Sequence, residues 1–573
     1  MAHDAFLRAI VASPDDDLPR LVYADYLEET GDSVRAEFIR VQCELARLAE
    51  ADPKRNSLED REHELLNEHE PEFLGDLDAH EQLQLREWKF RRGFLSDVTM
   101  NALSLDTLGS RLARRHPITG WTYQNQLGLT DFMDPSELLG SPGFAGIRRV
   151  DLSGSYDNNL NFESLFANEK TPPLEALDLS KLFDTAPLLA SLARSPLAAS
   201  IKSLSLGAWT ERPGDWQGDV PLEIVDRQLE SVLERMRLVH LDLGDSSLND
   251  SAVARIFAAP TAVGLKDLDL SYNPTSGDVW QSFRTADSTM RLKTLNLANT
   301  SVAHSHLEPL LASPVLADLT DLDISNCSST RENVEILVDS AYWQHARRLW
   351  TSVGKITADA LEPLVQSPGP SGLRVLDLSH NELRTEGVRR LAESAWAGSL
   401  TWLGLTNNTL DDEAARVLGH SGAFAQLRTL HLAQNWGDRR YPGSGLLTNR
   451  AAVYLANAPS LANLQVLTVS HAAMTEAGIE ALLNGPHWRL SGLGLSAVEL
   501  SEASVAILAN SPRLARLQWL DLSRNRGLEG SALKVLAESP YLSRLCELDI
   551  GYIGVDDATR DRLRDRLGHR LSE

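Results

Sequence analysis

One eleven-residue skeleton recurs through most of this 573-residue chain. Its clearest copy, at residues 373–383, reads LRVLDLSHNEL, with leucines alternating before an asparagine. Consecutive copies begin 26 to 28 residues apart, except for two steps of 37 residues. A fixed period of this length is typical of a stacked repeat array, in which each unit completes its core only against its neighbours. The copies begin at Ile147, Leu174, Ile201, Leu238, Leu265, Leu292, Leu319, Ala346, Leu373, Leu400, Leu427, Leu464, Leu490, Leu517 and Leu545.

Each unit combines a short strand with a helix. In the copy quoted above, Leu376 and Leu378 alternate with a period of two, so both point to one face of a strand. Asn381 follows where the chain leaves the strand, a position suited to an amide that hydrogen-bonds local backbone. The segment 385–394 then has its apolar residues on one helical face, with Thr385 as the expected N-cap. Strand and helix in alternation predict an α/β fold with a parallel sheet covered by helices.

This pattern resembles that of leucine-rich repeat proteins of the ribonuclease-inhibitor-like subclass, whose repeats also combine a strand and a helix. The resemblance covers roughly residues 90 to 555 and implies a horseshoe-shaped solenoid, with the parallel sheet on the concave face and the helices outside. Residues 91–573 are therefore expected to form the solenoid, with degenerate units as caps at both ends. The expected caps are an entry strand at Leu95, Val98 and Met100, a second strand at Ile118, Trp121 and Tyr123, and a helix at 556–571.

The first 90 residues differ from the array. They hold 23 Asp and Glu against 10 Lys and Arg, which leaves −12 of the formal net charge of −25 for the other 483 residues. Their apolar residues recur with helical spacing, so residues 1–90 are expected to form a small, acidic all-α domain. The words LPRLVYADYLEE and RAEFIRVQ resemble the repeat-companion domain found ahead of repeat arrays in planctomycete-type bacteria, although Tyr26 stands where that family usually has tryptophan. The resemblance implies a bacterial protein and no particular chemistry.

Cysteine usage and charge indicate a cytoplasmic protein that does not bind nucleic acid. Only three cysteines occur, Cys43, Cys327 and Cys546, in separate parts of the sequence, which is typical of structural thiols in a reducing compartment. The N-terminus lacks a basic region followed by an apolar run, and no apolar stretch is long enough to span a membrane. Nonspecific nucleic-acid binding needs clustered Lys and Arg, which an acidic chain does not favour. The protein is expected to be monomeric.

The common catalytic motifs are absent from the sequence, so no enzyme activity, metal or cofactor is expected. His63 and His69 are six positions apart, whereas a spacing of four would put both rings on one helix face. The polar residues of the N-terminal region are interpreted as ion pairs along and between helices. An enzymatic activity within residues 1–90 is the alternative, and it would use the same polar set: Arg20, Asp25, Glu28, Glu29, Arg35, Glu37 and Arg40.

Aspartate recurs between the second and third leucines of the skeleton, where the side chain faces away from the core. Carboxylates on strands about 4.8 Å apart repel one another unless they are compensated. Either each aspartate bonds a nearby serine or backbone group, or the column forms an acidic surface that attracts a basic partner. The aspartates are Asp151, Asp178, Asp242, Asp269, Asp323, Asp377, Asp521 and Asp549.

Aromatic and basic residues replace small or acidic ones at some positions on the same face. A tryptophan there has no role in the core, and aromatic and arginine anchors dominate binding energetics. Trp402 and His431 are expected on adjacent strands. The predicted binding residues on the sheet are Arg348, Trp350, Trp402, His431 and Trp519, and His240 lies at an equivalent position.

Each of the two longer steps contains a ten-residue insertion directly after a strand. Aromatic residues on special loops of a rigid scaffold are typical of binding sites, although these tryptophans would serve no such role if they packed back onto the array. The insertion at 435–447 carries Trp436, Arg439, Arg440 and Tyr441, and the insertion at 209–221 carries Trp209 and Trp216.

These observations predict a noncatalytic scaffold that binds a protein partner, with a basic surface on that partner, through the concave face and the two insertions. The acidic N-terminal domain is a candidate to dock a second partner. A regulator of an enzyme, acting as an inhibitor or a GTPase activator, is the alternative among noncatalytic functions. The sequence does not identify the partner.

Overall fold

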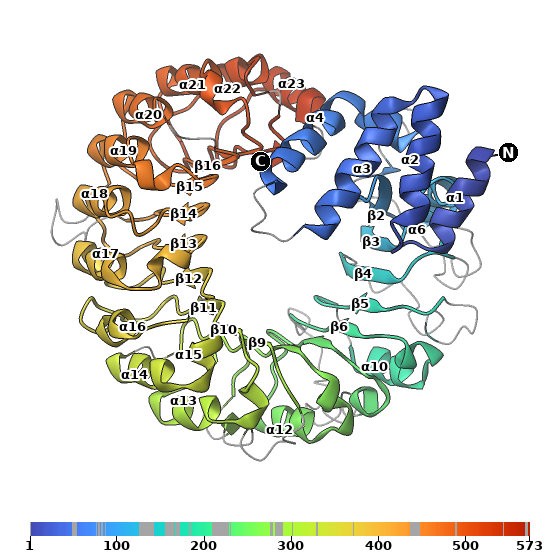
Figure 1. The fold of residues 1–573 in the computed structure, drawn as a ribbon, viewed down its shortest axis with the longest axis horizontal. Helices are drawn as coiled ribbons and strands as arrows, with labels where there is room; N and C mark the ends of the chain where they lie inside the picture. Colours follow the sequence, from blue (N-terminus) through green and yellow to red (C-terminus); the bar gives the residue numbers. More distant parts are fainter. Residues whose placement is uncertain are drawn as a thin grey trace, which may run out of the picture. The chain divides into compact units, whose positions relative to one another are not determined.

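The computed structural model describes residues 2–48, 54–75, 77, 81, 84–85, 87–124, 143–154, 166, 172–182, 185–208, 229, 231–275, 279–280, 283, 290–300, 302–327, 330–370, 372–435, 447–486, 490–542, 544–567 and 571–572. The chain divides into two compact units, Met1–Leu268 and Asp269–Glu573. Both units contain the repeated strand-and-helix element (Figure 1). No helix in these ranges combines the length and apolar character needed to cross a membrane.

The first unit begins with helices and an antiparallel hairpin, and continues as a parallel sheet. The helices are α1 (Ala2–Ala12), α2 (Leu18–Thr30), α3 (Ser33–Arg47) and α4 (Arg55–Leu74). The hairpin pairs β1 (Glu87–Arg91) with β2 (Phe94–Met100). From β2, each strand is parallel to the next: β3 (Gly120–Gln124), β4 (Arg149–Gly154), β5 (Ala176–Asp178), β6 (Ser203–Ser205) and β7 (His240–Asp242). Later helices include α10 (Thr185–Arg194) and α12 (Asp250–Ala258), and β8 (Asp267–Asp269) spans the division between the units.

The second unit is a regular parallel sheet with helices on its outer side (Figure 1). Its strands are β9 (Thr294–Asn296), β10 (Asp321–Asp323), β11 (Arg348–Trp350), β12 (Val375–Asp377), β13 (Trp402–Gly404), β14 (Thr429–His431), β15 (Val466–Thr468), β16 (Gly492–Gly494), β17 (Trp519–Asp521), β18 (Glu547–Asp549) and β19 (Leu571–Ser572). Its helices include α13 (His304–Leu311), α14 (Arg331–Asp339), α15 (Ala341–His345), α16 (Glu362–Gln366), α17 (Arg384–Glu393), α18 (Asp412–His420), α19 (Asn449–Ala456), α20 (Glu476–Leu483), α21 (Glu502–Ala509), α22 (Gly530–Ala537) and α23 (Asp557–Leu567).

The core of each repeat lies between the sheet and the helices. In the repeat at β12, Leu373, Leu376 and Leu378 are fully buried, and so are Val388 and Leu391 on the facing side of α17. The middle residues of adjacent strands are in register, so the strand leucines of neighbouring repeats stack on one another. This stacking buries apolar surface that one isolated repeat would leave in water. The predicted α/β fold and leucine-rich-repeat architecture are confirmed.

A buried amide follows several of the strands, as the sequence predicts for Asn381. The Asn381 side-chain amide donates to the carbonyl of Leu378 at 2.9 Å, and its oxygen accepts the backbone N–H of Ile356 at 3.0 Å. At the equivalent position, the Cys327 thiol donates to the carbonyl of Leu297 at 3.3 Å. Buried backbone groups need such partners, because they have left the strand ladder and cannot reach water. Asn408, Asn435 and Asn525 make the same kind of contacts.

Local boundaries differ from expectation at two places. Thr385 is not an N-cap, because α17 begins at Arg384 and the Thr385 hydroxyl donates instead to Asp411, the N-cap residue of α18. At the C-terminus, α23 ends at Leu567, and Leu571 belongs to β19, which pairs with β18. The expected entry strands are β2 and β3, and their apolar residues are buried.

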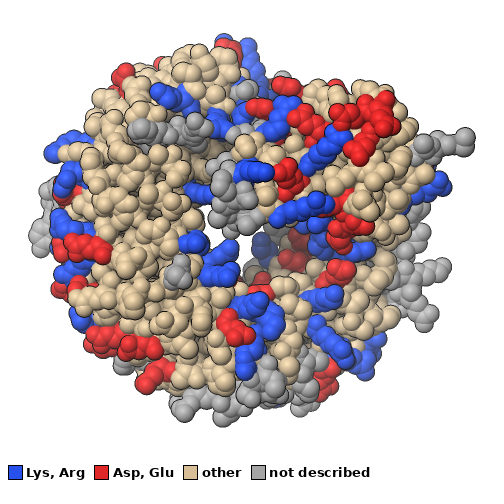
Figure 2. Space-filling view, in the orientation of Figure 1, with Lys and Arg blue, Asp and Glu red and all other residues tan. Residues whose placement is uncertain are grey.

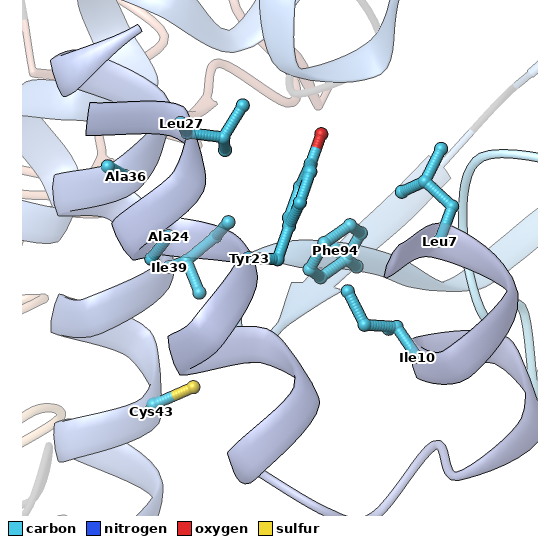
Figure 3. Close-up of a cluster of buried hydrophobic side chains, with 9 residues drawn as sticks. All are labelled: Leu7, Ile10, Tyr23, Ala24, Leu27, Ala36, Ile39, Cys43 and Phe94. Atoms are coloured by element: carbon cyan, nitrogen blue, oxygen red, sulfur yellow. The ribbon is translucent and has the colours of Figure 1, made fainter. Parts of the chain in front are cut away.

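A hydrophobic cluster joins the N-terminal helices to the hairpin (Figure 3). Phe94 of β2 packs among Leu7 and Ile10 of α1, Tyr23 of α2 and Ile39 of α3, all of them buried. The predicted domain boundary after residue 90 therefore falls inside a hairpin whose second strand contributes to the helical core.

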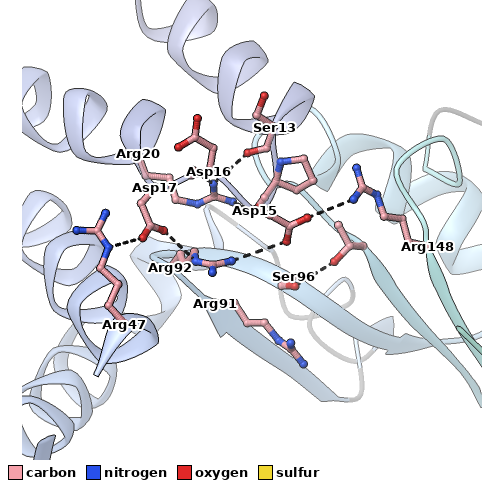
Figure 4. A network of polar contacts seen from close by, with 12 residues as sticks. Ser13, Asp15, Asp16, Asp17, Arg20, Arg47, Arg91, Arg92, Ser96 and Arg148 are labelled. Carbon is pink, nitrogen blue, oxygen red and sulfur yellow. Dashed lines mark hydrogen bonds and ion pairs between the residues drawn. The ribbon is translucent and has the colours of Figure 1, made fainter. Parts of the chain in front are cut away.

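A network of ion pairs borders this cluster (Figure 4). Asp17, at the start of α2, forms two ion pairs. Its Oδ2 atom lies 2.7 Å from Nε of Arg47 in α3, and its Oδ1 atom lies 2.9 Å from Nε of Arg92 in the hairpin turn. Asp15 lies 3.3 Å from Arg148, directly before β4. The network thus links the helices to the hairpin and to the first strands of the array.

Candidate functional site

The side of the sheet that faces away from the helices carries the candidate site. In each three-residue strand, the middle leucine points to the core, and the first and third residues point to this sheet face. Because the strands are in register, the first residues form one column and the third residues form another. Arg348, Trp402 and Trp519 belong to the first column, and Trp350 and His431 belong to the third-residue column.

The aspartates of the third-residue column are bonded locally. The backbone N–H of Ser379 donates to Asp377 Oδ1 at 2.9 Å, and both the N–H and the hydroxyl of Ser523 donate to Asp521 Oδ1. This bond to the residue two positions later supports the turn after the strand. It confirms the local-bonding interpretation for all eight aspartates: Asp151, Asp178, Asp242, Asp269, Asp323, Asp377, Asp521 and Asp549.

The aspartates of this column differ in whether their other carboxylate oxygen, Oδ2, also accepts a hydrogen bond. Asp242 Oδ2 accepts the hydroxyl of Ser205 at 2.8 Å, and Asp269 Oδ2 accepts the amide of Asn296 at 2.6 Å. Among the described side chains, none donates in this way to the aspartates near the tryptophans of the second unit. Within the described ranges, the hydrogen bonds of Asp323, Asp377, Asp521 and Asp549 all end on Oδ1.

Burial affects the charge state of two of these carboxyl groups. The pKa of Asp178 is raised chiefly by burial and further by Asp151 and Asp242. The pKa of Asp323 is raised in the same way, with smaller contributions from Asp377 and Asp269. Bonds from the following serines oppose both shifts. Repulsion between carboxylates on neighbouring strands is therefore present but secondary to burial.

Trp402 and His431 lie side by side on β13 and β14, as the sequence predicts. Their ring centroids are 5.0 Å apart with an interplanar angle of 53°, and both side chains are only partly exposed. The Nδ1 atom of His431 shares a hydrogen bond of 3.0 Å with the Thr468 hydroxyl. Burial lowers the pKa of His431, and the charge of Asp377 opposes that shift.

Glycines provide the space for the tryptophan rings, a feature that the sequence analysis missed. A Cβ on Gly404 would lie 2.8 and 2.9 Å from Trp402 Cη2 and Cζ3, and it would overlap Asp377 Oδ1. The ring of Trp519 lies over β16, where a Cβ on Gly492 or Gly494 would be 3.1 and 3.3 Å from it. Glycine weakens a strand, so glycines at these positions are the signal that would have indicated a close approach.

Trp350 and Arg348 occupy the two sheet-face positions of β11. Trp350 is partly exposed and stands in register between Asp323 of β10 and Asp377 of β12. Arg348 is half exposed, and its guanidinium lies 3.8 Å from Asp321. The second unit thus brings together four predicted binding residues on β11, β13 and β14, and Trp519 lies further along the sheet on β17.

The predicted residues of the two insertions lie outside the described residues. Trp209 and Trp216 belong to 209–228, and the described chain of the second insertion stops at Asn435 and resumes at Leu447. The remaining predicted residues in that insertion are Trp436, Arg439, Arg440 and Tyr441. Their participation in a binding site stays a prediction.

The sheet face of the first unit contains a separate hollow of about 190 Å³. An ion pair between Arg149 and Asp97, 2.7 Å long, crosses β3 at Gly120, where a side chain would overlap the carboxylate. At the equivalent position on β7, exposed His240 pairs with Asp267. The polar residues lining the hollow are Asp97, Thr122, Arg149, Asp151, Asp178, Ser203 and Ser205.

The polar set of the N-terminal helices forms mostly the ion pairs that the sequence predicts. Arg40 of α3 pairs with Asp25 and Glu28 of α2, and Glu37 pairs with Arg61 of α4. Asp and Glu side chains gather in places on the visible surface of this region, with Lys and Arg among them (Figure 2). Among the described residues, no three His, Cys, Asp or Glu side chains are grouped closely enough to hold a metal ion.

Two arginines of that set, buried Arg20 and partly exposed Arg35, bind backbone carbonyls. Arg20 is 2 % exposed and donates to the carbonyls of Pro14 and Asp16, while its guanidinium lies 5.8 Å from the Phe94 ring centroid. Arg35 donates to the carbonyl of Phe73 and lies over the same Phe94 ring. Burial lowers the pKa of both groups. The two guanidinium groups thus hold carbonyls of the α1–α2 loop and of the end of α4 close to Phe94 of the hairpin.

No protein-family description and no curated protein matches the sequence. The chain is similar to the solved Rad7–Elc1 complex of yeast, with 18% identity over 66% of this chain and 82% of that chain, at a TM-score of 0.43. It is also similar to an internalin from Listeria monocytogenes, with 16% identity over 55% of this chain and 81% of that chain, at a TM-score of 0.33. The repeat architecture itself rests on the strand register and the buried leucines.

Proposed function

We propose that this protein is a noncatalytic scaffold that binds a protein partner through the sheet face of its second unit. The observation that carries the proposal is the paired arrangement of Trp402 and His431 on a face where Gly404 makes room for the ring. Partly exposed aromatic side chains on a rigid frame are typical anchors of protein–protein interfaces. The two insertions follow strands of the same array, and we include their aromatic and arginine residues in the proposed interface.

We propose that residues 1–90 form an acidic repeat-companion domain and residues 91–573 a ribonuclease-inhibitor-like array, in a monomeric bacterial protein of the cytoplasm. The three free thiols support a reducing compartment. The pairing of Arg40 with Asp25 and Glu28 supports a structural role for the polar residues of the first 90 positions.

Affinity capture with cross-linking from the source cell tests the proposed function. The full chain is compared with a variant carrying Trp402→Ala, Trp436→Ala and Tyr441→Ala. The matched control carries Tyr272→Ala and Tyr552→Ala, which remove aromatics that are 59 % and 74 % exposed after strands β8 and β18. We expect the first variant to lose a partner that the control retains, with unchanged circular dichroism for both. Retention of every partner by the first variant would exclude this surface.

A further inference from the structure

We propose that the sheet face of the second unit recognises arginine side chains of its protein partner. The site is the acid–aromatic row, which consists of Asp323, Trp350, Asp377, Trp402 and His431. This inference rests on the proposed function and specifies the chemistry of the partner. It follows from the order of these side chains, from the oxygen atoms they leave available, and from the charge around them.

The acid–aromatic row crosses five successive strands. Asp323, Trp350 and Asp377 are third residues of β10, β11 and β12 and are directly in register. On β13 the third residue is Gly404, and the ring of Trp402 from the same strand covers it. His431 of β14 completes the row beside that ring. From Asp323 to Trp402, carboxylate and aromatic groups therefore alternate at the spacing of neighbouring strands, about 4.8 Å.

The carboxylates of the row retain acceptor capacity. Asp323 and Asp377 receive their local hydrogen bonds on Oδ1, from Ser325 and Ser379. Asp269, one strand before β9, differs because Asn296 occupies its Oδ2. A carboxylate with one oxygen held by the turn is fixed in orientation, and its other oxygen can accept a hydrogen bond from a ligand. Acceptance from a charged donor is stronger than from a neutral one.

Beside the carboxylates, the tryptophan rings offer aromatic surface to a guanidinium group. Asp377 Oδ1 and the edge of the Trp402 ring converge on the same point above Gly404. A cation placed over an aromatic face is attracted by the ring, and a carboxylate next to that face adds an ion pair. Arginine suits this combination better than lysine, because its planar guanidinium stacks on the ring while its N–H groups still reach the carboxylate.

The charge around the acid–aromatic row favours a cation. Arg348 is the first residue of β11, two positions before Trp350. Its Nε atom lies 3.8 Å from Asp321 Oδ1, and this carboxylate offsets the charge of the guanidinium. Further along the same sheet face, Trp519 stands beside Asp521 and Glu547 and repeats the aromatic-and-acid combination. Carboxylates next to these rings favour the approach of a basic segment.

The strand spacing predicts the spacing of the arginines. Trp350 and Trp402 lie two strands apart, at about 10 Å, with Asp377 between them. A segment in polyproline II conformation has three residues per turn and advances about 3.1 Å per residue, so arginines three positions apart lie on one side, about 9 Å from each other. The expected partner therefore presents an Arg-x-x-Arg segment in polyproline II conformation.

Fluorine NMR of the full chain labelled with 5-fluorotryptophan tests the inference. The resonances of Trp350 and Trp402 are assigned from Trp350→Phe and Trp402→Phe. The probe is the peptide acetyl-Arg-Gly-Ser-Arg-amide, and the matched peptide has citrulline, which is planar but neutral, in place of both arginines. We expect the arginine peptide to shift these two resonances and not those of buried Trp280 and Trp343. The citrulline peptide should bind about ten-fold more weakly.

Two charge variants complete the test. Asp377→Asn keeps an oxygen for the Ser379 N–H and removes the charge, so we expect about a five-fold loss of affinity for the arginine peptide. Asp178→Asn makes the same change in the first unit and should leave the affinity unchanged. Equal binding of the two peptides, or no shift of either resonance, overturns arginine recognition. If capture of a partner still depends on Trp402 in that case, the proposed function stands; if the peptide binds but no partner is lost from capture, only the proposed function fails.

Discussion

The backbone N–H of Gly93, in the turn between β1 and β2, donates a hydrogen bond to the side-chain oxygen of Gln42 on α3. The amide group of Gln42 donates in turn to Glu62 of α4 at 2.7 Å. One buried glutamine thus connects the hairpin that opens the array to two of the N-terminal helices. Burial raises the pKa of Glu62, and the bond from Gln42 opposes that shift.

Gly93→Ala is expected to destabilise the contact between the hairpin turn and α3. Gly93 has φ +83, and a Cβ would lie 2.7 Å from the backbone Cα of Ile39, so the helix or the turn must move. We expect a loss of about 3 kcal/mol in the free energy of unfolding, measured by urea titration. The control is Gly31→Ala, where φ is +100 but no atom lies within 4 Å, and backbone strain alone costs about 1 kcal/mol. Equal losses would show that Gly93 is not packed against α3.

Buried His116 is expected to make the first unit acid-sensitive. Its Nδ1 accepts the backbone N–H of Leu95 at 3.2 Å, and burial lowers its pKa to about 3. The unfolded chain binds a proton near pH 6.5 and the folded chain does not, so stability falls as the pH drops from about 6.5 towards 3. Between pH 7 and pH 5 this group should account for roughly 2 kcal/mol.

Two histidine variants separate the contribution of His116 to the acid sensitivity from that of other groups. His116→Gln keeps a side-chain acceptor but cannot titrate, so its urea midpoint should change less between pH 7 and pH 5 than that of the natural chain. His345→Gln, at an exposed position on α15, should leave the pH dependence unchanged. The same pH dependence in all three proteins would assign the acid sensitivity to other groups.

Gly404→Ala is expected to displace the Trp402 ring. The added methyl group would stand at the point where the ring and the Asp377 carboxylate converge. We expect a loss of about 1–3 kcal/mol in stability and a shift of Trp402 fluorescence towards that of exposed tryptophan. Gly554→Ala, where no atom lies within 4 Å, is the control and should change neither quantity appreciably. An unshifted fluorescence spectrum in Gly404→Ala would mean that the ring does not rest on this strand.

The three cysteines are expected to differ in reactivity. Cys43 is 1 % exposed, and burial raises its pKa to about 12, so only ~10⁻⁴ of it is thiolate at pH 8. Cys327 is also buried, with a raised pKa, whereas Cys546 is partly exposed. Iodoacetamide should therefore label Cys546 first in the native protein, as read by peptide mass spectrometry. Rapid labelling of Cys43 would indicate that the N-terminal helices open readily.

Neighbouring positions on the sheet could be predicted because the repeat period is constant. Trp402 and His431 occupy adjacent strands, and a fixed period of about 27 residues with parallel strands brings such positions together. The interpretation of the aspartates as locally bonded was also correct, since a serine or glycine two residues later supplies the N–H. The prediction of an N-cap at Thr385 was wrong, because the Thr385 hydroxyl donates a hydrogen bond to Asp411 of the following repeat.

The sequence by itself determined the repeat, the fold class and the columns of side chains on the sheet, because these depend on periods of two and of 27 residues. The tertiary structure decided which features of those columns matter. Only packing across strands reveals that Gly404 makes room for a ring, that Asp377 keeps an oxygen available, and that Phe94 belongs to the helical core. The first two features depend on side-chain shape and on the position of hydrogen-bond donors, which the period does not encode. The third joins residues with no periodic relation in the chain.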